Sequence, residues 1–129
     1  MTVDALRALS DARYINLETF KKDGTGVQTP VWFAELDGAL VVFTDGTSFK
    51  VKRIRRDARA RVAECDVRGK VRGPWFEAKA AIVPKDGDES DRAYAALRRK
   101  YGLQMKLLDV ASRLGGRIGR REVIRIALV

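Results

Sequence analysis

Histidine is absent from the 129 residues of this sequence, and cysteine occurs only once, at Cys65. Without histidine the chain supplies no Ser-His-Asp or Cys-His catalytic group, no His-ligated zinc and no His-ligated haem. A single cysteine excludes an internal disulfide and argues against a transition-metal site. If the chain is an enzyme, we therefore expect a bound cofactor to carry its chemistry.

Long apolar runs are also missing, since no segment approaches the roughly 20 apolar residues that a membrane span needs. The first four residues include an acidic residue and no basic one, unlike the basic and then apolar start of a signal peptide. Together with the single cysteine, which fits a reducing compartment, this predicts a cytoplasmic protein with no membrane partner. The length and a hydrophobic content of 46% predict one globular domain over residues 1–129.

Basic charge is in excess, and it is unevenly spread along the chain. The net charge is +9, made up of −3 over residues 1–49, +7 over residues 50–79 and +5 over residues 80–129. A field of this sign attracts anions such as phosphates, polycarboxylates, nucleic acid or acidic lipid. The basic excess begins at Lys50.

Hydrophobic periodicity predicts a mainly β chain. Pro30 would lie in a strand at an edge or a bulge, because proline cannot donate to the ladder, and Asp37-Gly38 is a hairpin signal. The short strands and a helical insert at about 90–115 indicate a closed antiparallel β-barrel of the Greek-key type. We expect six strands, over residues 14–20, 27–36, 39–44, 60–66, 75–83 and 123–129, and helices over residues 3–13, 50–56, 90–101 and 103–114.

Some of these elements carry finer expectations about burial. Alternation over residues 14–20 suits a strand that is buried on one face only. Cys65 and the two tryptophans are interpreted as packed residues rather than as reactive or ring-stacking groups. The side chains concerned are Val51 and Ile54 as the inward pair of the short helix, Leu107, Leu108 and Ala111 as the apolar residues of the last helix, and Trp32, Cys65 and Trp75 as packing residues.

The segment from Thr44 to Asp57 is the strongest candidate for a binding site. An apolar run ends in a turn of Asp, Gly, Thr and Ser, and the turn opens into a short segment with five basic residues. A hydroxyl-rich turn at a helix N-terminus offers free backbone N–H groups and a positive dipole end. With the charges just beyond, this arrangement can hold a phosphate at the end of a β-strand. The alternative is an ordinary solvated helix face opposite Val51 and Ile54.

Several groups of residues follow one another in a recognisable order over residues 14–83. They are Tyr14 to Phe20, Gly24, Thr29-Pro30-Val31-Trp32-Phe33, Thr44, the run from Lys50 to Asp57, and Cys65-Asp66-Val67-Arg68-Gly69. Their order and spacing resemble those of the flavin/deazaflavin oxidoreductase superfamily, the pyridoxamine-phosphate-oxidase-like split β-barrel group. The later groups resemble its actinobacterial, deazaflavin-dependent branch.

The resemblance implies a homodimer of split barrels, with cofactors in clefts between the subunits. It implies coenzyme F-420, an 8-hydroxy-5-deazaflavin with a phosphate and an oligoglutamate tail, or else FMN. The implied activity is hydride transfer between the bound cofactor and a small conjugated or carbonyl compound, with no catalytic side chain and no metal. The implied cofactor-binding residues are Thr29, Pro30, Val31 and Trp32 along the ring, Thr44 at its edge, and Thr47, Ser48, Lys50, Lys52 and Arg53 at the phosphate.

Other interpretations stay open. The same barrel can act as an FMN-dependent oxidoreductase or as a carrier of its cofactor. The charge also suits a nucleic-acid-binding protein, and the segment from Arg113 to Arg121 resembles a flexible basic arm. Aromatic residues make up only 8% of the chain and do not interleave with the basic runs, so nucleic-acid binding is the weaker interpretation.

Overall fold

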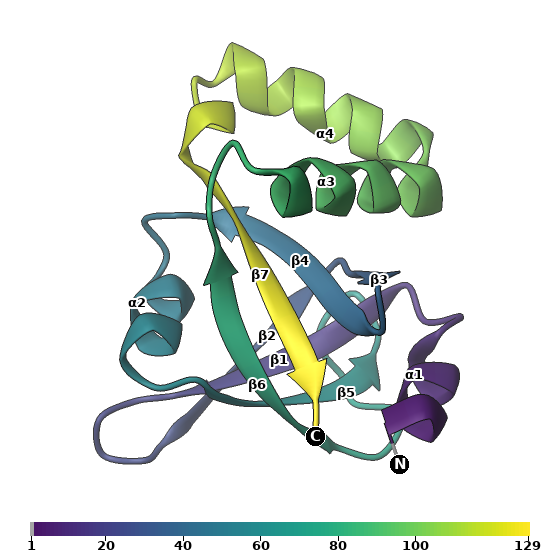
Figure 1. Ribbon diagram of the computed structural model, residues 1–129, viewed down its shortest axis with the longest axis vertical. Coiled ribbons are helices and arrows are strands. Elements are labelled where there is room, and N and C mark those ends of the chain that lie inside the picture. The colour runs from purple at the N-terminus through teal and green to yellow at the C-terminus, as the bar shows by residue number, and fades with distance from the viewer. Residues whose placement is uncertain (1) are drawn as a thin grey trace.

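The computed structural model of the protein describes residues 2–129, which form one curled antiparallel sheet with helices around it (Figure 1). This agrees with the mainly β architecture that the sequence predicts. The strands are β1 (Tyr14–Phe20), β2 (Gly26–Val31), β3 (Ala34–Leu36), β4 (Ala39–Asp45), β5 (Arg59–Cys65), β6 (Phe76–Val83) and β7 (Arg121–Leu128). The helices are α1 (Thr2–Leu9), α2 (Phe49–Arg56), α3 (Asp88–Tyr101) and α4 (Leu103–Leu114), and a 3-10 turn, η1 (Ile118–Arg120), precedes β7.

The order of the strands shows that the sheet closes on itself. Within residues 2–129 the order is β2-β1-β5-β6-β7-β4-β3, and neighbouring strands are antiparallel. β2 and β3 lie at opposite ends of this order, although only Trp32 and Phe33 separate them in the chain. So short a link cannot cross a flat sheet whose strands lie about 4.8 Å apart. The sheet must therefore curl until its two edges meet, which produces a split barrel.

The predicted strand over residues 27–36 is in fact two strands, so the sheet has seven strands rather than six. Tyr101 of α3 contacts both residues of the link between β2 and β3, Trp32 and Phe33. Its hydroxyl accepts a hydrogen bond from Phe33 N at 3.0 Å, and its ring stacks on Trp32 with centroids 4.4 Å apart. Because these contacts come from a distant helix, local periodicity does not reveal them. Pro30 lies on the edge strand β2, as predicted.

β1 is buried on both faces, whereas the alternation predicts burial of one face only. Leu17 lies in the barrel core, and Asn16 and Glu18, on the opposite face, are only 3% and 5% exposed. Glu18 accepts a hydrogen bond from Arg61 Nε at 2.6 Å, and Asn16 donates to the Gly69 carbonyl at 2.8 Å. These partners, from β5 and from the loop that follows it, make the second buried face possible.

Hydrophobic side chains form two clusters, one inside the barrel and one between the sheet and α3. α2 packs against the barrel through Val51 and Ile54, which are buried as predicted. Trp32 belongs to the second cluster, and Cys65 is a buried free thiol, so both are packing residues as expected. Trp75 is half-buried beneath the guanidinium of Arg61, 4.8 Å from its ring centroid.

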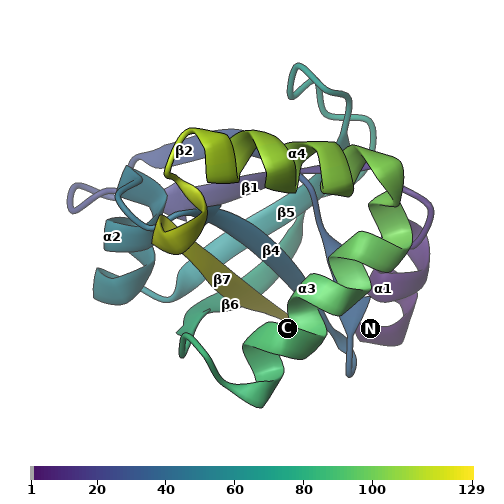
Figure 2. The ribbon, with the colours of Figure 1, turned by 90° about the horizontal axis from the view of Figure 1, so that it is seen from above.

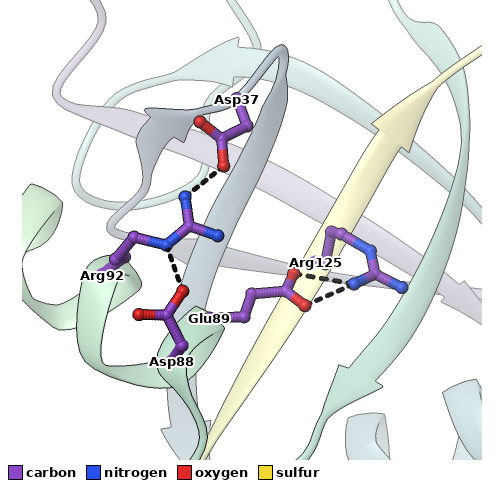
Figure 3. Close-up of polar contacts among 5 residues, drawn as sticks. All are labelled: Asp37, Asp88, Glu89, Arg92 and Arg125. Carbon is purple, nitrogen blue, oxygen red and sulfur yellow. Dashed lines mark hydrogen bonds and ion pairs between the residues drawn. The ribbon is translucent and has the colours of Figure 1, made fainter.

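The hairpin of α3 and α4 stands at one end of the molecule, beyond the sheet (Figures 1 and 2). Two arginines tie the start of α3 to the barrel (Figure 3). Arg92 of α3 binds Asp37, in the turn between β3 and β4, and Asp88 at 2.8 Å. Arg125 of β7 donates to both carboxylate oxygens of Glu89 at 2.7 Å. The pairs are exposed, so they fix the position of the helix more than they stabilise the fold.

α4 turns one apolar and two polar side chains toward the protein. Its apolar residues in the sequence pattern, Leu107, Leu108 and Ala111, are exposed, and the side chains that it buries are Met105, Asp109 and Ser112. None of the helices in residues 2–129 is both long and apolar enough to cross a membrane.

Candidate functional site

The turn between β4 and α2 brings the predicted phosphate ligands to one end of the sheet. Asp45 fixes this turn, because its Oδ1 accepts hydrogen bonds from the backbone N–H of Thr47 at 2.9 Å and from its hydroxyl at 2.7 Å. Gly46 donates its N–H to the carbonyl of Arg120, and a Cβ atom at this position would lie only 2.8 Å from that oxygen. Thr47, a predicted phosphate ligand, is therefore already engaged within the turn.

Ser48 precedes α2 as its N-cap residue, yet its side chain does not cap the helix. Its hydroxyl oxygen is buried and has no hydrogen-bond partner among residues 2–129. The first turn of α2 contains no acidic residue, although a helix N-terminus carries free N–H groups and a partial positive charge. An unpaired hydroxyl at an uncompensated helix N-terminus fits an anionic group such as a phosphate.

Lys50 is a half-buried cation without a carboxylate partner. Its Nζ lies 3.3 Å from Thr44 Oγ1, and it takes part in no ion pair within residues 2–129. Burial lowers the pKa of the Lys50 ammonium below its ordinary value, and the positive charge of Arg53 lowers it further, while the charge of Asp45 offsets part of the shift. An anion at this position would offset both effects. The fold thus brings Lys50 and Thr44, both predicted site residues, into contact.

A basic groove of about 530 Å³ adjoins α2 and the turn between β1 and β2. Arg53 Nε donates to Thr19 Oγ1 at 2.7 Å, and Lys52 Nζ lies over the ring of Phe49, 5.3 Å from its centroid. None of the cations of this groove forms an ion pair with a carboxylate within residues 2–129, although the charge of Lys21 acts on Asp23 at longer range. The lining consists of Lys21, Lys22, Phe49, Lys52, Arg53 and Arg56.

Nearby basic side chains that point away from the groove are paired with carboxylates. Arg55, also on α2, lies 3.6 Å from Glu122, and Arg61 of β5 lies 2.6 Å from Glu18. On α2 the unpaired cations are therefore those that line the groove or contact Thr44. This distribution favours an anion-binding site over a uniformly solvated helix face.

A smaller cleft of about 130 Å³ opens where the end of β4 approaches α4 and the start of β7. Phe43, Thr44 and Asp45 line it from β4, Leu108 and Ser112 from α4, and Arg117 and Arg121 from the segment after α4. Thr44 thus borders the cleft and also contacts Lys50 beside the basic groove. The guanidinium of Arg121 lies 4.8 Å from the centroid of the Phe43 ring and pairs with Asp109 at 2.6 Å, so its charge is already compensated.

The four residues predicted to lie along a cofactor ring do not share one surface. Thr29 and Val31 are half-buried on the core side of β2, and Pro30 is exposed on the other side. Trp32 lies beyond the strand with its edge toward Phe43, at a centroid distance of 6.4 Å. Trp32 therefore approaches the small cleft through Phe43, and the cofactor-binding roles of all four residues stay a prediction.

Lys21, Lys22 and Arg56 line the groove, although the sequence interpretation did not place them in the site. The lysine pair is visible in the sequence as part of a polar turn, but nothing local shows that this turn lies against α2. Phe43 and Arg121 of the small cleft were missed for the same reason, because they meet only when β4 and β7 pair.

The segment from Arg113 to Arg121 is not the free basic arm that it resembles in sequence. It contains the end of α4, η1 and the first residue of β7. Arg120 lies 3.5 Å from Asp45, and Arg121 is only 9% exposed. The observation that most favoured nucleic-acid binding is therefore corrected.

The curled sheet, with α2 packed against the barrel and α3 covering one side, defines a split β-barrel of the pyridoxamine-phosphate-oxidase-like class. The family model of pyridoxamine 5'-phosphate oxidase matches residues 2–129, and the chain belongs to this family. No curated protein sequence matches the chain.

Solved structures share the fold at low sequence identity. The conserved hypothetical protein Rv2991 from Mycobacterium tuberculosis is 24% identical, with a TM-score of 0.70 over 98% of this chain and 79% of its own. HutZ, the heme storage protein from Vibrio cholerae, is 11% identical, with a TM-score of 0.71 over 98% and 87%. A putative pyridoxamine 5'-phosphate oxidase from Listeria innocua is 12% identical, with a TM-score of 0.62 over 98% and 92%. At these identities the likeness shows the fold alone.

Proposed function

We propose that this chain is an oxidoreductase that binds coenzyme F-420 and transfers a hydride between it and a small conjugated or carbonyl compound. The observation that carries the proposal is Lys50, a half-buried cation whose only polar partner within residues 2–129 is the hydroxyl of Thr44. The unpaired hydroxyl of Ser48, at the N-terminus of the same helix, supports it. Membership of a family that commonly binds flavins supports the class of cofactor.

The size and charge of the basic groove favour the deazaflavin over FMN. FMN carries one phosphate, whereas coenzyme F-420 carries a phosphate and an oligoglutamate tail with several carboxylates. A groove of about 530 Å³ with five cations and no carboxylate partner among residues 2–129 offers more positive charge than one phosphate requires.

The residues of the chain would have binding and orienting roles. Ser48, Lys50 and the free N–H groups at the start of α2 would hold the phosphate. Lys52 or Arg53 would add positive charge at the phosphate, and the lysines of the β1–β2 turn would attract the tail. Thr44 would donate its hydroxyl at the edge of the ring. When bound, the cofactor supplies the hydride chemistry, so the protein needs no nucleophile and no acid–base pair.

We also propose that the functional unit is a homodimer with the cofactor at the subunit interface. The cleft beside Thr44 measures about 130 Å³, whereas pockets for organic ligands usually measure about 300–1,000 Å³. A second subunit would supply the missing wall. Light scattering coupled to gel filtration would give the mass in solution, and a monomer that binds the cofactor fully would contradict this part of the proposal.

Haem is a weaker alternative, although two structural neighbours are described as a heme storage protein and a heme binding protein. This chain has no histidine, and its single cysteine is buried. Histidine is therefore missing as an axial ligand, and the one thiol is not exposed to a ligand.

The proposal is tested by titrating the purified protein with coenzyme F-420 and, separately, with FMN, following fluorescence at two salt concentrations. We expect tighter binding of the deazaflavin, and we expect salt to weaken it because several charges contribute. A preference for FMN would assign the chain to the flavin-dependent members of the same fold. Binding of neither cofactor by folded protein would overturn the proposed function, and nucleic-acid binding would then be the next test.

A further inference from the structure

Helix α4 has its polarity reversed relative to an ordinary surface helix. Met105, Asp109 and Ser112 face the protein. On a helix of 3.6 residues per turn, the positions opposite these three are 103, 107, 110 and 114. All four are apolar and exposed: Leu103 (70%), Leu107 (62%), Val110 (48%) and Leu114 (85%). We call these four side chains the α4 stripe.

The orientation of α4 is fixed by buried polar contacts, so the α4 stripe cannot rotate inward. Arg121 donates to Asp109 at 2.6 Å and to the hydroxyl of Ser112 at 2.8 Å, and Arg98 adds a bond to Asp109 at 3.2 Å. Turning the helix over would bury leucines but would leave the guanidinium of Arg121 without its carboxylate. The fold therefore holds an apolar ridge toward the outside, where an exposed patch of this kind marks an interaction surface.

The charges around the α4 stripe have one sign. Residues 98–121 contain eight lysines and arginines and a single acidic residue, Asp109, which is used internally. Lys106 and Arg113, seven residues apart, share one flank of the stripe. Neither cation forms an ion pair within residues 2–129. An apolar helix face beside unpaired cations is complementary to a surface with an apolar interior and anionic groups at its boundary with water.

We propose that α4 docks on an anionic lipid surface, with the α4 stripe in the boundary between headgroups and acyl chains. A helix of twelve residues is about 18 Å long and can lie flat in this boundary. α4 also lies at one end of the molecule, where it can meet a plane (Figures 1 and 2). The sequence led us to expect no membrane partner because no segment can span, but a helix that lies on a membrane needs no such segment.

Charge argues against a second copy of this chain as the occupant. Pairing of two α4 stripes would bring Lys106 and Arg113 close to their own copies, and like charges oppose such an interface. The homodimer proposed above would use the side of the cleft at Thr44, and the docking proposal stands whether or not that cleft binds a cofactor.

The test is co-sedimentation of the full chain with vesicles of phosphatidylcholine alone or with about one third phosphatidylserine. We expect binding to the anionic vesicles that is about tenfold tighter than to the neutral ones and weaker at high salt. Leu107→Gln/Leu114→Gln should reduce the binding about tenfold, since it removes two apolar side chains from the boundary. Lys106→Gln/Arg113→Gln should also reduce it, by roughly fivefold for each charge.

Val67→Gln is the matched control, because Val67 is 62% exposed but lies on the β5–β6 loop. It should bind vesicles as the original protein does, and circular dichroism should show that all variants are folded. The absence of binding to anionic vesicles would overturn the proposal. Binding that Leu107→Gln/Leu114→Gln leaves unchanged would also overturn it, because the attraction would then be general to a basic surface. A dimer that this same variant dissociates would assign the α4 stripe to a second copy instead.

Discussion

Lys50 is half-buried without a carboxylate partner, so its charge should cost the folded protein free energy while serving an anionic ligand. We predict that Lys50→Met weakens binding of coenzyme F-420 by at least about tenfold, as expected for the loss of a charge-assisted contact. The same variant should unfold at an equal or higher denaturant concentration than the original protein. Fluorescence titration and urea denaturation measure the two effects on one sample.

Arg55→Met is the matched control for this prediction. Arg55 lies on the same helix but points toward Glu122, at 3.6 Å. Its removal should leave the affinity for coenzyme F-420 within about twofold, because exposed ion pairs contribute little. Equal loss of affinity in both variants would show that the charge of α2 acts only as a diffuse field, and the assignment of Lys50 to a phosphate would then fail.

The hydroxyl of Tyr101 joins three parts of the chain, and its removal should be costly. It accepts a hydrogen bond from Phe33 N at 3.0 Å and donates to the carbonyl of Arg13 at 2.7 Å. Tyr101→Phe leaves a buried N–H without a partner, so we predict a loss of about 1–3 kcal/mol in the free energy of unfolding. Tyr94→Phe, on the same helix and without a side-chain hydrogen bond within residues 2–129, should cost much less. Equal losses in urea denaturation would refute this role of the hydroxyl.

At the scale of the elements, the sequence predicts those whose burial follows a local pattern. The spacing of Val51 and Ile54 predicts α2 and its buried side, and Asp37-Gly38 predicts the hairpin between β3 and β4. The sequence does not predict the structure where a distant side chain determines it. Tyr101 contacts the link that separates β2 from β3, where periodicity predicts one strand, and Arg121 binds the polar residues that α4 buries. Neither contact leaves a signal in the residues that it affects.

The buried pair of Arg121 and Asp109 should therefore control how α4 sits on the barrel. Burial alone would raise the pKa of the Asp109 carboxyl, but hydrogen bonds from Arg121 and Arg98 hold it below its ordinary value. We predict that Arg121→Met lowers the free energy of unfolding by about 3–5 kcal/mol at neutral pH, because it leaves a buried carboxylate poorly paired. Urea denaturation measures this loss.

The double variant Arg121→Met/Asp109→Leu separates the ion pair from other roles of the arginine. It removes both charges, so most of the lost stability should return. The deficit of the single variant should also shrink in acid, since the pair in the original protein contributes stability only above the folded pKa of Asp109. A double variant as unstable as Arg121→Met would show that packing of the arginine over Phe43, at 4.8 Å, matters more than its charge.

Some residues of the candidate site are likewise predictable from local sequence, and others are not. Thr44, Ser48 and Lys50 are predictable because a hydroxyl-rich turn, a helix start and a basic run are adjacent in the chain. Lys21, Lys22 and Phe43 are not, because they join the site only through strand pairing and the curl of the sheet. Local sequence therefore locates the phosphate end of the proposed site and leaves its walls to the fold.

For the molecule as a whole, the curl of the sheet follows from one short link. Only Trp32 and Phe33 connect strands at opposite ends of the order, so a closed sheet is the arrangement that satisfies the chain. The same closure carries α3 against the β2–β3 link, where Lys100 Nζ lies 3.4 Å from the centroid of the Phe33 ring. A half-buried lysine and a buried tyrosine thus lie together where the barrel closes, which makes global stability sensitive to alkaline pH.

Burial, together with the charge of Arg13, lowers the pKa of Lys100 from 10.5 to about 8, and burial raises the pKa of Tyr101 from 10.0 to about 12. Between pH 8 and 10.5 the unfolded chain therefore binds more protons at Lys100 than the folded one does, so stability rises with pH over this range. Between pH 10 and 12 the folded chain retains the proton of Tyr101 that the unfolded chain loses, so stability falls again.

We predict that Lys100→Met is more stable than the original protein at pH 7 by roughly 1 kcal/mol, because solvent screens the half-exposed ammonium and the Phe33 ring attracts it. The difference should close between pH 8 and 10.5, because the original protein loses the unfavourable charge there and the variant has none to lose. Urea denaturation of both proteins at pH 7, 8, 9 and 10 isolates Lys100 from every other titrating group. A difference that stays constant across this range would show that Lys100 keeps its charge in the folded state, and that its contact with Phe33 outweighs its burial.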